Sequence, residues 1–307
     1  MAFTCRELTP PLASSDIILD LATVVDIDNY TQITTTNGKG ALKAKAFNAI
    51  DITDDVALFT AGAVSGAGSF VDLVTNQLLA SVDVGIGAQV NANGELVMEA
   101  NGLFVVDLHS KSETYGIGTV AVGHARMDIL PDNLITINGS VVANRDAWLT
   151  AGTDRYRTIA QHALTARVDN VAGSAIPIND LKTRAVIIAD NAITVSSGAL
   201  LQSNANIALI AESIGTADIN VMAKSVNWVS IVGDAVDAVL GGNNANLGPG
   251  FATAKARGSV VNDGVIRTGA ERQKDLILSV DETTGTITGT STTSAGTITF
   301  TLDPLPT

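Results

Sequence analysis

The chain repeats itself, and this internal similarity limits the folds open to it more than any other feature. The unit VGIGAQVNANGELVMEA (84–100) has looser copies at 137–152 and 195–213, and a fainter one at about 24–46. Each copy contains a strand pattern, a tight bend with glycine or asparagine, and a second short strand. A spacing of about 50–60 residues is typical of stacked units that bury a shared core.

Apolar and polar residues alternate along most of the chain with the period of two that indicates β-strands. Examples are IILDLATVVDI from residue 17 and ALKAKAFNAIDI from residue 41. Hydrophobic residues make up 46% of the chain but aromatics only 4%, so the core must consist of small aliphatic side chains in thin layers. We therefore predict an all-β fold, a right-handed parallel β-helix (β-solenoid) with irregular loop insertions.

Turn signals divide the pattern into strand runs of about five residues, which predicts coils of about 20 residues and two or three coils per repeat. A dozen such coils, about 4.8 Å apart, would form a rod of roughly 55–60 Å. Glycine and asparagine tolerate the backbone of tight corners. The predicted structural corners are Gly66, Gly68, Gly87, Asn93, Gly94, Gly116, Gly118, Asn138, Gly139 and Gly198.

Four segments follow from composition. Residues 1–15, with Pro10 and Pro11, are predicted to form an irregular lead-in or N-terminal cap, and residues 16–240 the solenoid repeats. Residues 241–282 are predicted as a loop insertion followed by final coils. The Thr-rich residues 283–307 are predicted to form terminal strands, a hairpin or a linker.

Motifs for cofactor and metal chemistry are weak. The glycine pairs of 66–68 and 116–118 lack the third glycine and the helix of a dinucleotide-binding fingerprint, so we expect no cofactor. His109, His124 and His162 lack the spacing of metal ligands and are interpreted as surface or structural residues. No elbow-type serine motif marks a nucleophile.

Two charged clusters keep an enzyme as the alternative function. Polysaccharide lyases and hydrolases with β-helix folds place such groups side by side on one sheet, and glycoside hydrolysis requires paired carboxylates. Adjacent residues of a strand point to opposite faces, so we interpret these clusters as solvated charges. They are Asp51, Asp54 and Asp55, and Arg145, Asp146, Asp154, Arg155 and Arg157.

The net charge of −13 argues against nucleic acid as a partner, because phosphate binding requires a basic stripe. Calcium is the metal that the acidic composition leaves open, although the GGxGxD motif of calcium-binding β-rolls is absent. Threonine runs at 31–36 and 284–301 are similar to ice-binding faces, but they lie near the two ends instead of in every repeat. An ice- or calcium-binding solenoid is the further alternative.

The strand-bend-strand units at 82–100, 134–152 and 192–212 resemble the repeat regions of large bacterial filamentous adhesins, the filamentous-haemagglutinin-like proteins often exported by two-partner secretion. The segment DGVIRTGAERQKDLILSV (263–280) is similar in form to a non-repeat unit of such proteins. The resemblance implies a non-catalytic, structural and adhesive part or subunit of a bacterial surface fibre or stalk. The family's N-terminal secretion domain, with its NPNG-type signature, is not found in this chain.

The resemblance also implies an extracellular or cell-surface location, with end-to-end self-association or continuation into a longer chain, and a host surface or polysaccharide as ligand. The residues themselves predict no transmembrane segment, because no apolar run approaches the roughly 20 residues needed. Residues 1–16 lack the basic and apolar regions of a Sec signal peptide. A single cysteine, Cys5, leaves the redox compartment open.

Overall fold

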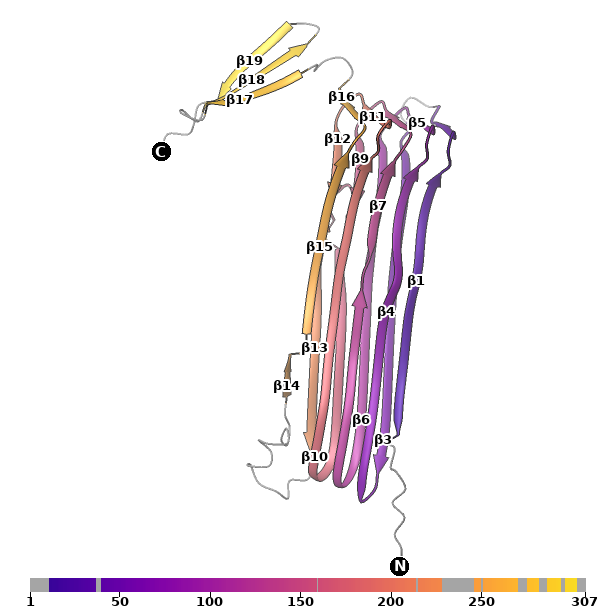
Figure 1. Cartoon of the computed structure of the whole chain (residues 1–307), viewed down its shortest axis with the longest axis vertical. Helices are drawn as coiled ribbons and strands as arrows, with labels where there is room; N and C mark the ends of the chain where they lie inside the picture. Colours follow the sequence, from indigo (N-terminus) through magenta and orange to yellow (C-terminus); the bar gives the residue numbers. More distant parts are fainter. Residues whose placement is uncertain are drawn as a thin grey trace, which may run out of the picture.

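The computed structural model describes residues 11–36, 40–158, 160–213, 215–227, 246–249, 251–269, 275–281, 286–293 and 296–302. These residues form β-strands and turns, without a helix, so the all-β prediction is confirmed. Most strands are parallel to their hydrogen-bonded neighbours. They form two long layers and one short sheet, and the long dimension follows the strands (Figure 1).

The strands of one long layer, here called the ascending layer, point to the top of Figure 1. It consists of β1 (Leu12–Ile27), β4 (Val64–Val84), the second half of β6 (Leu96–Ile129) continued by β7 (Asp132–Ile137), the second half of β10 (Ala160–Val195), and β15 (Phe251–Asn262).

The strands of the other long layer, the descending layer, run the opposite way. It consists of β3 (Leu42–Ala61), the first half of β6, β9 (Ala147–Ala151) followed by the first half of β10, and β12 (Ile207–Ala211) followed by β13 (Gly215–Asn227). Because β6 and β10 each reverse direction without a break in strand structure, they belong to both layers.

A short five-stranded sheet joins the layers at the top. It contains β2 (Gln32–Thr34), β5 (Gln89–Ala92), β8 (Ser140–Ala143), β11 (Leu200–Ser203) and β16 (Val265–Thr268), again in parallel register. One turn of the chain therefore passes down one layer, up the other, and across the short sheet.

The register shows the size of each turn. Leu42 pairs with Leu96, Leu96 with Ala147, and Ala147 with Ile207. One sequence repeat is thus one complete turn, and the predicted coil of about 20 residues was wrong. The predicted rod of a dozen coils was also wrong, because the five ascending strands of the described residues span about 19 Å at a spacing of about 4.8 Å.

The error arose because glycines inside long strands were interpreted as turns. β4 has 21 residues, which corresponds to about 70 Å of extended chain. Gly102 lies inside β6, where an added Cβ would be 3.0 Å from the carbonyl oxygen of Asn48. The glycine therefore allows two strands to pack closely and does not end a strand.

Two apolar clusters fill the space between the layers. The upper cluster includes Met98 and Leu149 of the descending layer, Val82 and Ile135 of the ascending layer, and Val141 of the short sheet. The lower cluster is built from larger residues of both layers, among them Leu73, Phe104, Leu108, Met127 and Leu164. Each turn alone is too thin to bury these side chains, so stacking creates the core.

Buried polar side chains between the layers pair with one another, either across the layers or along successive turns. The hydroxyl groups of Ser69 and Ser110 are 2.6 Å apart, and Ser110 Oγ also donates to the carbonyl oxygen of Ser69 at 2.7 Å. Asn133 Nδ2 donates to Asn191 Oδ1 of the next turn at 2.8 Å. Such hydrogen bonds satisfy polar groups that would otherwise be costly to bury.

The predicted segment boundaries fall on the structure as follows. β1 begins at Leu12, inside the predicted lead-in, and residues 1–10 lie outside the described part. Within the predicted insertion, β14 (Asn246–Pro249) pairs antiparallel with β13. β17 (Asp275–Asp281), β18 (Thr286–Thr293) and β19 (Gly296–Leu302) form a separate antiparallel sheet.

Candidate functional site

The predicted corner residues occupy three kinds of position. Gly87 and Gly198 lie in the turns before the short sheet with φ of 71° and 82°, and Tyr30 adopts φ of 61° in the first such turn. Gly116 and Gly118 lie where β6 reverses between layers. Gly66 and Gly68 lie within β4, beyond the bend at 62–63, and are therefore strand residues.

The remaining corner residues flank the short sheet. Asn138 and Gly139 connect β7 to β8, and an added Cβ at Gly139 would lie 2.5 Å from the carbonyl oxygen of Ala88. Asn93 and Gly94 connect β5 to β6. The three residues Asn93, Asn144 and Asn204 form a ladder along successive turns, with amide-to-amide hydrogen bonds of 3.1 Å.

The carboxylates of the first charged cluster do not converge. Asp51 and Asp55 lie on the outer face of β3 and are exposed, whereas Asp54 points to the opposite face. Asp55 instead contacts His109 of the next turn at 3.0 Å, and His109 contacts Asp169 of the following turn at 3.0 Å. The three form a surface ladder across the descending layer.

The other two histidines also lie in strands. His124 Nε2 is 2.8 Å from Asp72 Oδ2 on the outer face of the ascending layer. His162 faces the interior, where its ring stacks on Phe104 and its Nδ1 accepts from the Phe104 amide at 3.3 Å. Burial lowers the pKa of His162 below its ordinary value.

The structure divides the second charged cluster. Arg145 and Asp146 lie between β8 and β9, where Asp146 accepts from the Asn206 side chain at 2.9 Å. Asp154, Arg155 and Arg157 lie on the connection between β9 and β10. This connection, residues 152–158, is here called the excursion.

The excursion is an insertion in one turn of the stack. β9 pairs with β6 at an offset of 51 residues (Leu96 with Ala147), but β10 pairs with β6 at an offset of 58 (Val105 with Ala163). Seven additional residues must therefore leave the plane of the descending layer. The pairing of β3 with β6 keeps one offset from end to end, so the equivalent strand of the preceding turn has no such insertion.

Asp154 organises the excursion. Its Oδ1 accepts from the amides of Tyr156 (3.1 Å) and Thr158 (2.8 Å), and its Oδ2 accepts from the Thr158 hydroxyl at 2.8 Å. Burial alone would raise the pKa of Asp154, but these hydrogen bonds and the charge of Lys45 outweigh burial and lower it. The carboxylate is thus held ionised as a structural acceptor.

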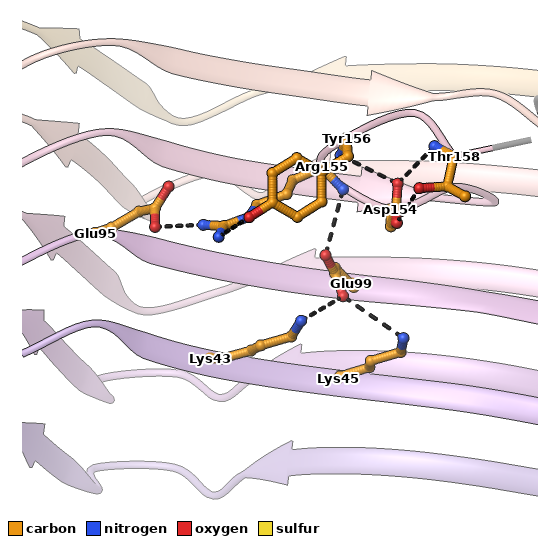
Figure 2. Close-up of polar contacts among 8 residues, drawn as sticks. All are labelled: Lys43, Lys45, Glu95, Glu99, Asp154, Arg155, Tyr156 and Thr158. Atoms are coloured by element: carbon orange, nitrogen blue, oxygen red, sulfur yellow. Dashed lines mark hydrogen bonds and ion pairs between the residues drawn. The ribbon is translucent and has the colours of Figure 1, made fainter.

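A buried carboxylate lies beneath the excursion. Glu99 is 1% exposed although it belongs to the outer face of β6. Its Oε1 accepts from the Arg155 amide at 3.3 Å, and its Oε2 is 3.1 Å from Lys43 Nζ and 3.9 Å from Lys45 Nζ. Figure 2 shows both lysines extending from the neighbouring strand toward this carboxylate.

The guanidinium of Arg155 closes the other side of the cluster. It forms an ion pair with Glu95, donates to the Tyr156 hydroxyl, and lies 4.5 Å from the centroid of the Tyr156 ring (Figure 2). Arg157 pairs with Glu212 at 2.6 Å. Ion pairs therefore tie the excursion to the preceding turn through Glu95 and to the following turn through Glu212.

A hollow of about 440 Å³ opens between the excursion and the outer face of the descending layer. Phe47 lines it and is 40% exposed, with Lys45 Nζ 4.7 Å from its ring centroid. The other polar lining comes from Asn101, Thr153, Asp154, Thr158 and Gln161. The hollow thus combines one exposed ring with amide and hydroxyl groups.

Sequence patterns pointed to Asp154 and Arg155 but missed Lys43, Lys45, Glu95 and Glu99. Glu95 and Glu99 lie about one repeat away in the sequence, and Lys43 and Lys45 about two repeats away, so the register alone brings them under the excursion. The alternating KAK of 43–45 and the lone glutamate of 99 were the available signals. Their significance depends on knowing which residues pair.

A second hollow, also about 440 Å³, lies on the ascending layer and is lined by His124, Arg126, Lys182 and Arg184. Asp128 contacts Arg126 and accepts from Arg184 Nε at 2.8 Å. Burial would raise the pKa of Asp128, but the hydrogen bonds from the two arginines lower it. Asp128 therefore neutralises part of the positive charge that Arg126 and Arg184 bring to this hollow.

Within the described part of the chain, no group of three or more His, Cys, Asp or Glu residues is arranged to hold a metal ion. In the same residues, no helix is long and apolar enough to cross a membrane. Comparisons of the chain with protein families, curated proteins and solved structures find no match.

Proposed function

We propose that the chain is a structural and adhesive module, a right-handed parallel β-helix that forms part or a subunit of an extracellular bacterial surface fibre or stalk and has no catalytic activity. The observation that carries this proposal is the parallel register in which successive turns stack. Parallel strands joined by crossovers are almost always right-handed, which supports the proposed hand. A stack of this kind adds length and surface without a catalytic centre.

Open strand edges support association at the end of the stack. Among the described strands, β1, β2 and β3 each pair with a neighbour on one side. Leu21 occupies an inward position of β1 and is nevertheless 37% exposed. Open edges recruit a further strand, so another turn, from a longer chain or a second copy, would cover this surface.

Negative-stain microscopy and light scattering over a range of concentrations test the association. We expect end-to-end assemblies that grow with concentration. Leu21→Lys places a charge at the open edge and should return the protein to single particles, whereas Ile117→Lys, an exposed position at the reversal of β6, should not. Single compact particles at every concentration would defeat the proposed self-association.

The alternative of a polysaccharide-cleaving enzyme has a specific counterargument. Glycoside hydrolysis needs a carboxylic acid whose pKa is raised so that it can protonate the leaving group. The pKa of Asp154, the acidic residue that lines the hollow beneath the excursion, is lowered, and both of its oxygens accept hydrogen bonds. We therefore expect no release of reducing ends from neutral or acidic polysaccharides, and turnover that Asp154→Asn abolishes would reverse this conclusion.

A further inference from the structure

We propose that the hollow beneath the excursion is a binding site for a neutral saccharide. The inference deepens the proposed adhesive function, because it assigns a ligand class to one place on the stack. It rests on four properties of the hollow: its exposed ring, its unpaired polar atoms, its balanced charge and its fixed walls.

The exposed ring is Phe47 on the outer face of β3. A phenyl ring on a surface provides an apolar platform for the C–H face of a sugar ring. Phe47 pairs in register with Asn101, so an amide lies directly beside the platform. This pairing of an apolar face with a polar neighbour matches the two kinds of surface on a pyranose.

Two residues that line the hollow each hold a buried side-chain oxygen with no hydrogen-bond partner among the described residues. The two oxygens are Asn101 Oδ1 and Thr153 Oγ1, and their residues are 8% and 4% exposed. Buried polar groups are normally paired, and an unpaired one carries a cost. Ligand hydroxyl groups, which both donate and accept, are suited to satisfy them.

The fixed charges around the hollow cancel. Lys45 and Asp154 are the two charged residues of its lining, and Lys45 is also held near Glu99 and the Phe47 ring. With a net charge of −13 for the chain, an anionic ligand would have no excess positive charge to meet it here. A neutral ligand fits this balance.

The walls are fixed before any ligand arrives. Asp154 holds the backbone of the excursion through Tyr156 and Thr158, and Glu99 holds its other side through the Arg155 amide. A site that is already ordered loses little conformational entropy on binding. Stacking of the strands does not require the insertion in this turn, whereas a binding site at the hollow accounts for it.

The test is calorimetric titration of the full chain with cellotetraose, chitotetraose, maltotetraose and mannotetraose, and with tetragalacturonate as the anionic comparison. We expect at least one neutral oligosaccharide to bind. Phe47→Ala should weaken that binding by about tenfold or more. Phe59→Ala is the matched control, because Phe59 lies on the same face of the same strand, is 63% exposed and is not part of the hollow.

Asn101→Leu provides a second variant of similar size without the amide, and it should also weaken binding. Circular dichroism and thermal unfolding of each variant establish that it is folded. The proposal is overturned if no neutral oligosaccharide binds, if tetragalacturonate alone binds, or if Phe47→Ala weakens binding no more than Phe59→Ala. Failure here would leave the concentration-dependent assembly unchanged, so the two proposals fail separately.

Discussion

At the scale of single residues, two glycines at the reversal of β6 differ in what surrounds them. An added Cβ at Gly116 would overlap the carbonyl oxygen of Gly62 in the preceding turn, whereas a Cβ at Gly118 would have no atom within 4 Å. Neither residue has a positive φ. The close approach of two turns therefore requires glycine at the first position and not at the second.

We expect Gly116→Ala to lower the free energy of unfolding by about 1–3 kcal/mol through overpacking. Gly118→Ala should change it by less than about 1 kcal/mol, because the substitution meets open space. Urea denaturation of both variants measures the difference. Equal destabilisation by the two substitutions would contradict the packing described for this reversal.

His162, which is half-buried, should make stability depend on pH. The unfolded chain binds a proton at this residue near its ordinary pKa of 6.5, but burial lowers the pKa in the folded state. Stability is therefore greatest above that ordinary value and falls as the pH drops through it. Protonation of Nδ1 would also remove the acceptor for the Phe104 amide.

The measurement is the melting temperature between about pH 7.5 and 5, where an unperturbed histidine titrates. The unmodified protein should lose more stability over this range than His162→Gln, in which the group that titrates is absent. Parallel curves for the two proteins would show that His162 does not contribute.

At the scale of elements, two asparagine ladders differ in burial. Asn133 and Asn191 are 4% and 2% exposed, and Asn133 donates to Asn191 Oδ1 while Asn191 donates to Ser213 Oγ at 3.1 Å. The hydrogen bond between Asn93 and Asn144 lies at the exposed corner. Water can replace a lost partner at the corner but not between the layers.

Asn133→Ala should therefore cost about 1–3 kcal/mol, because Asn191 Oδ1 loses its donor in a dry core. Asn144→Ala should cost less than about 1 kcal/mol, since its partners remain hydrated. Chemical denaturation compares the two variants. A larger loss for the exposed residue would be inconsistent with this assignment of the buried ladder.

The order of the excursion depends on the side chain of Asp154. Asp154→Ala removes three hydrogen bonds that hold the backbone and the Thr158 hydroxyl of the excursion to one charged acceptor. We expect trypsin to cleave after Arg155 and Arg157 about tenfold faster or more, because local opening becomes easier. Asp146→Ala, at the top corner, is the control and should leave the cleavage rate at these two arginines unchanged.

Only part of the candidate site could be predicted from the sequence. Asp154 and Arg155 stood out as a charged cluster, but nothing in the sequence connects them with Glu99 or Phe47. That connection depends on the change of register from 51 to 58 residues at the excursion. Periodicity identifies which residues are in strands and leaves the pairing of those strands undetermined.

At the scale of the whole molecule, the alternating pattern and the repeat together predicted parallel stacked strands, and the structure is all-β with parallel layers. The number of turns was overestimated because Gly66 and Gly68 were interpreted as corners although they lie in an extended strand. Strands of about 20 residues are far longer than the usual five or six. An expectation based on ordinary strand length therefore placed too many corners in the chain.

The stacked fold requires that each sequence repeat form one complete turn. Thr53 and Asp107 are exposed and are register partners on adjacent strands. Their Cα atoms are about 4.8 Å apart, which is within the range that a disulfide can bridge. In a Cys5→Ser background, Thr53→Cys with Asp107→Cys should oxidise to an intramolecular disulfide. Thr53→Cys with Lys111→Cys, displaced by about 13 Å along the strand, should not. Equal oxidation of the two pairs, or none in the first pair of a folded protein, would contradict the register and with it the stack.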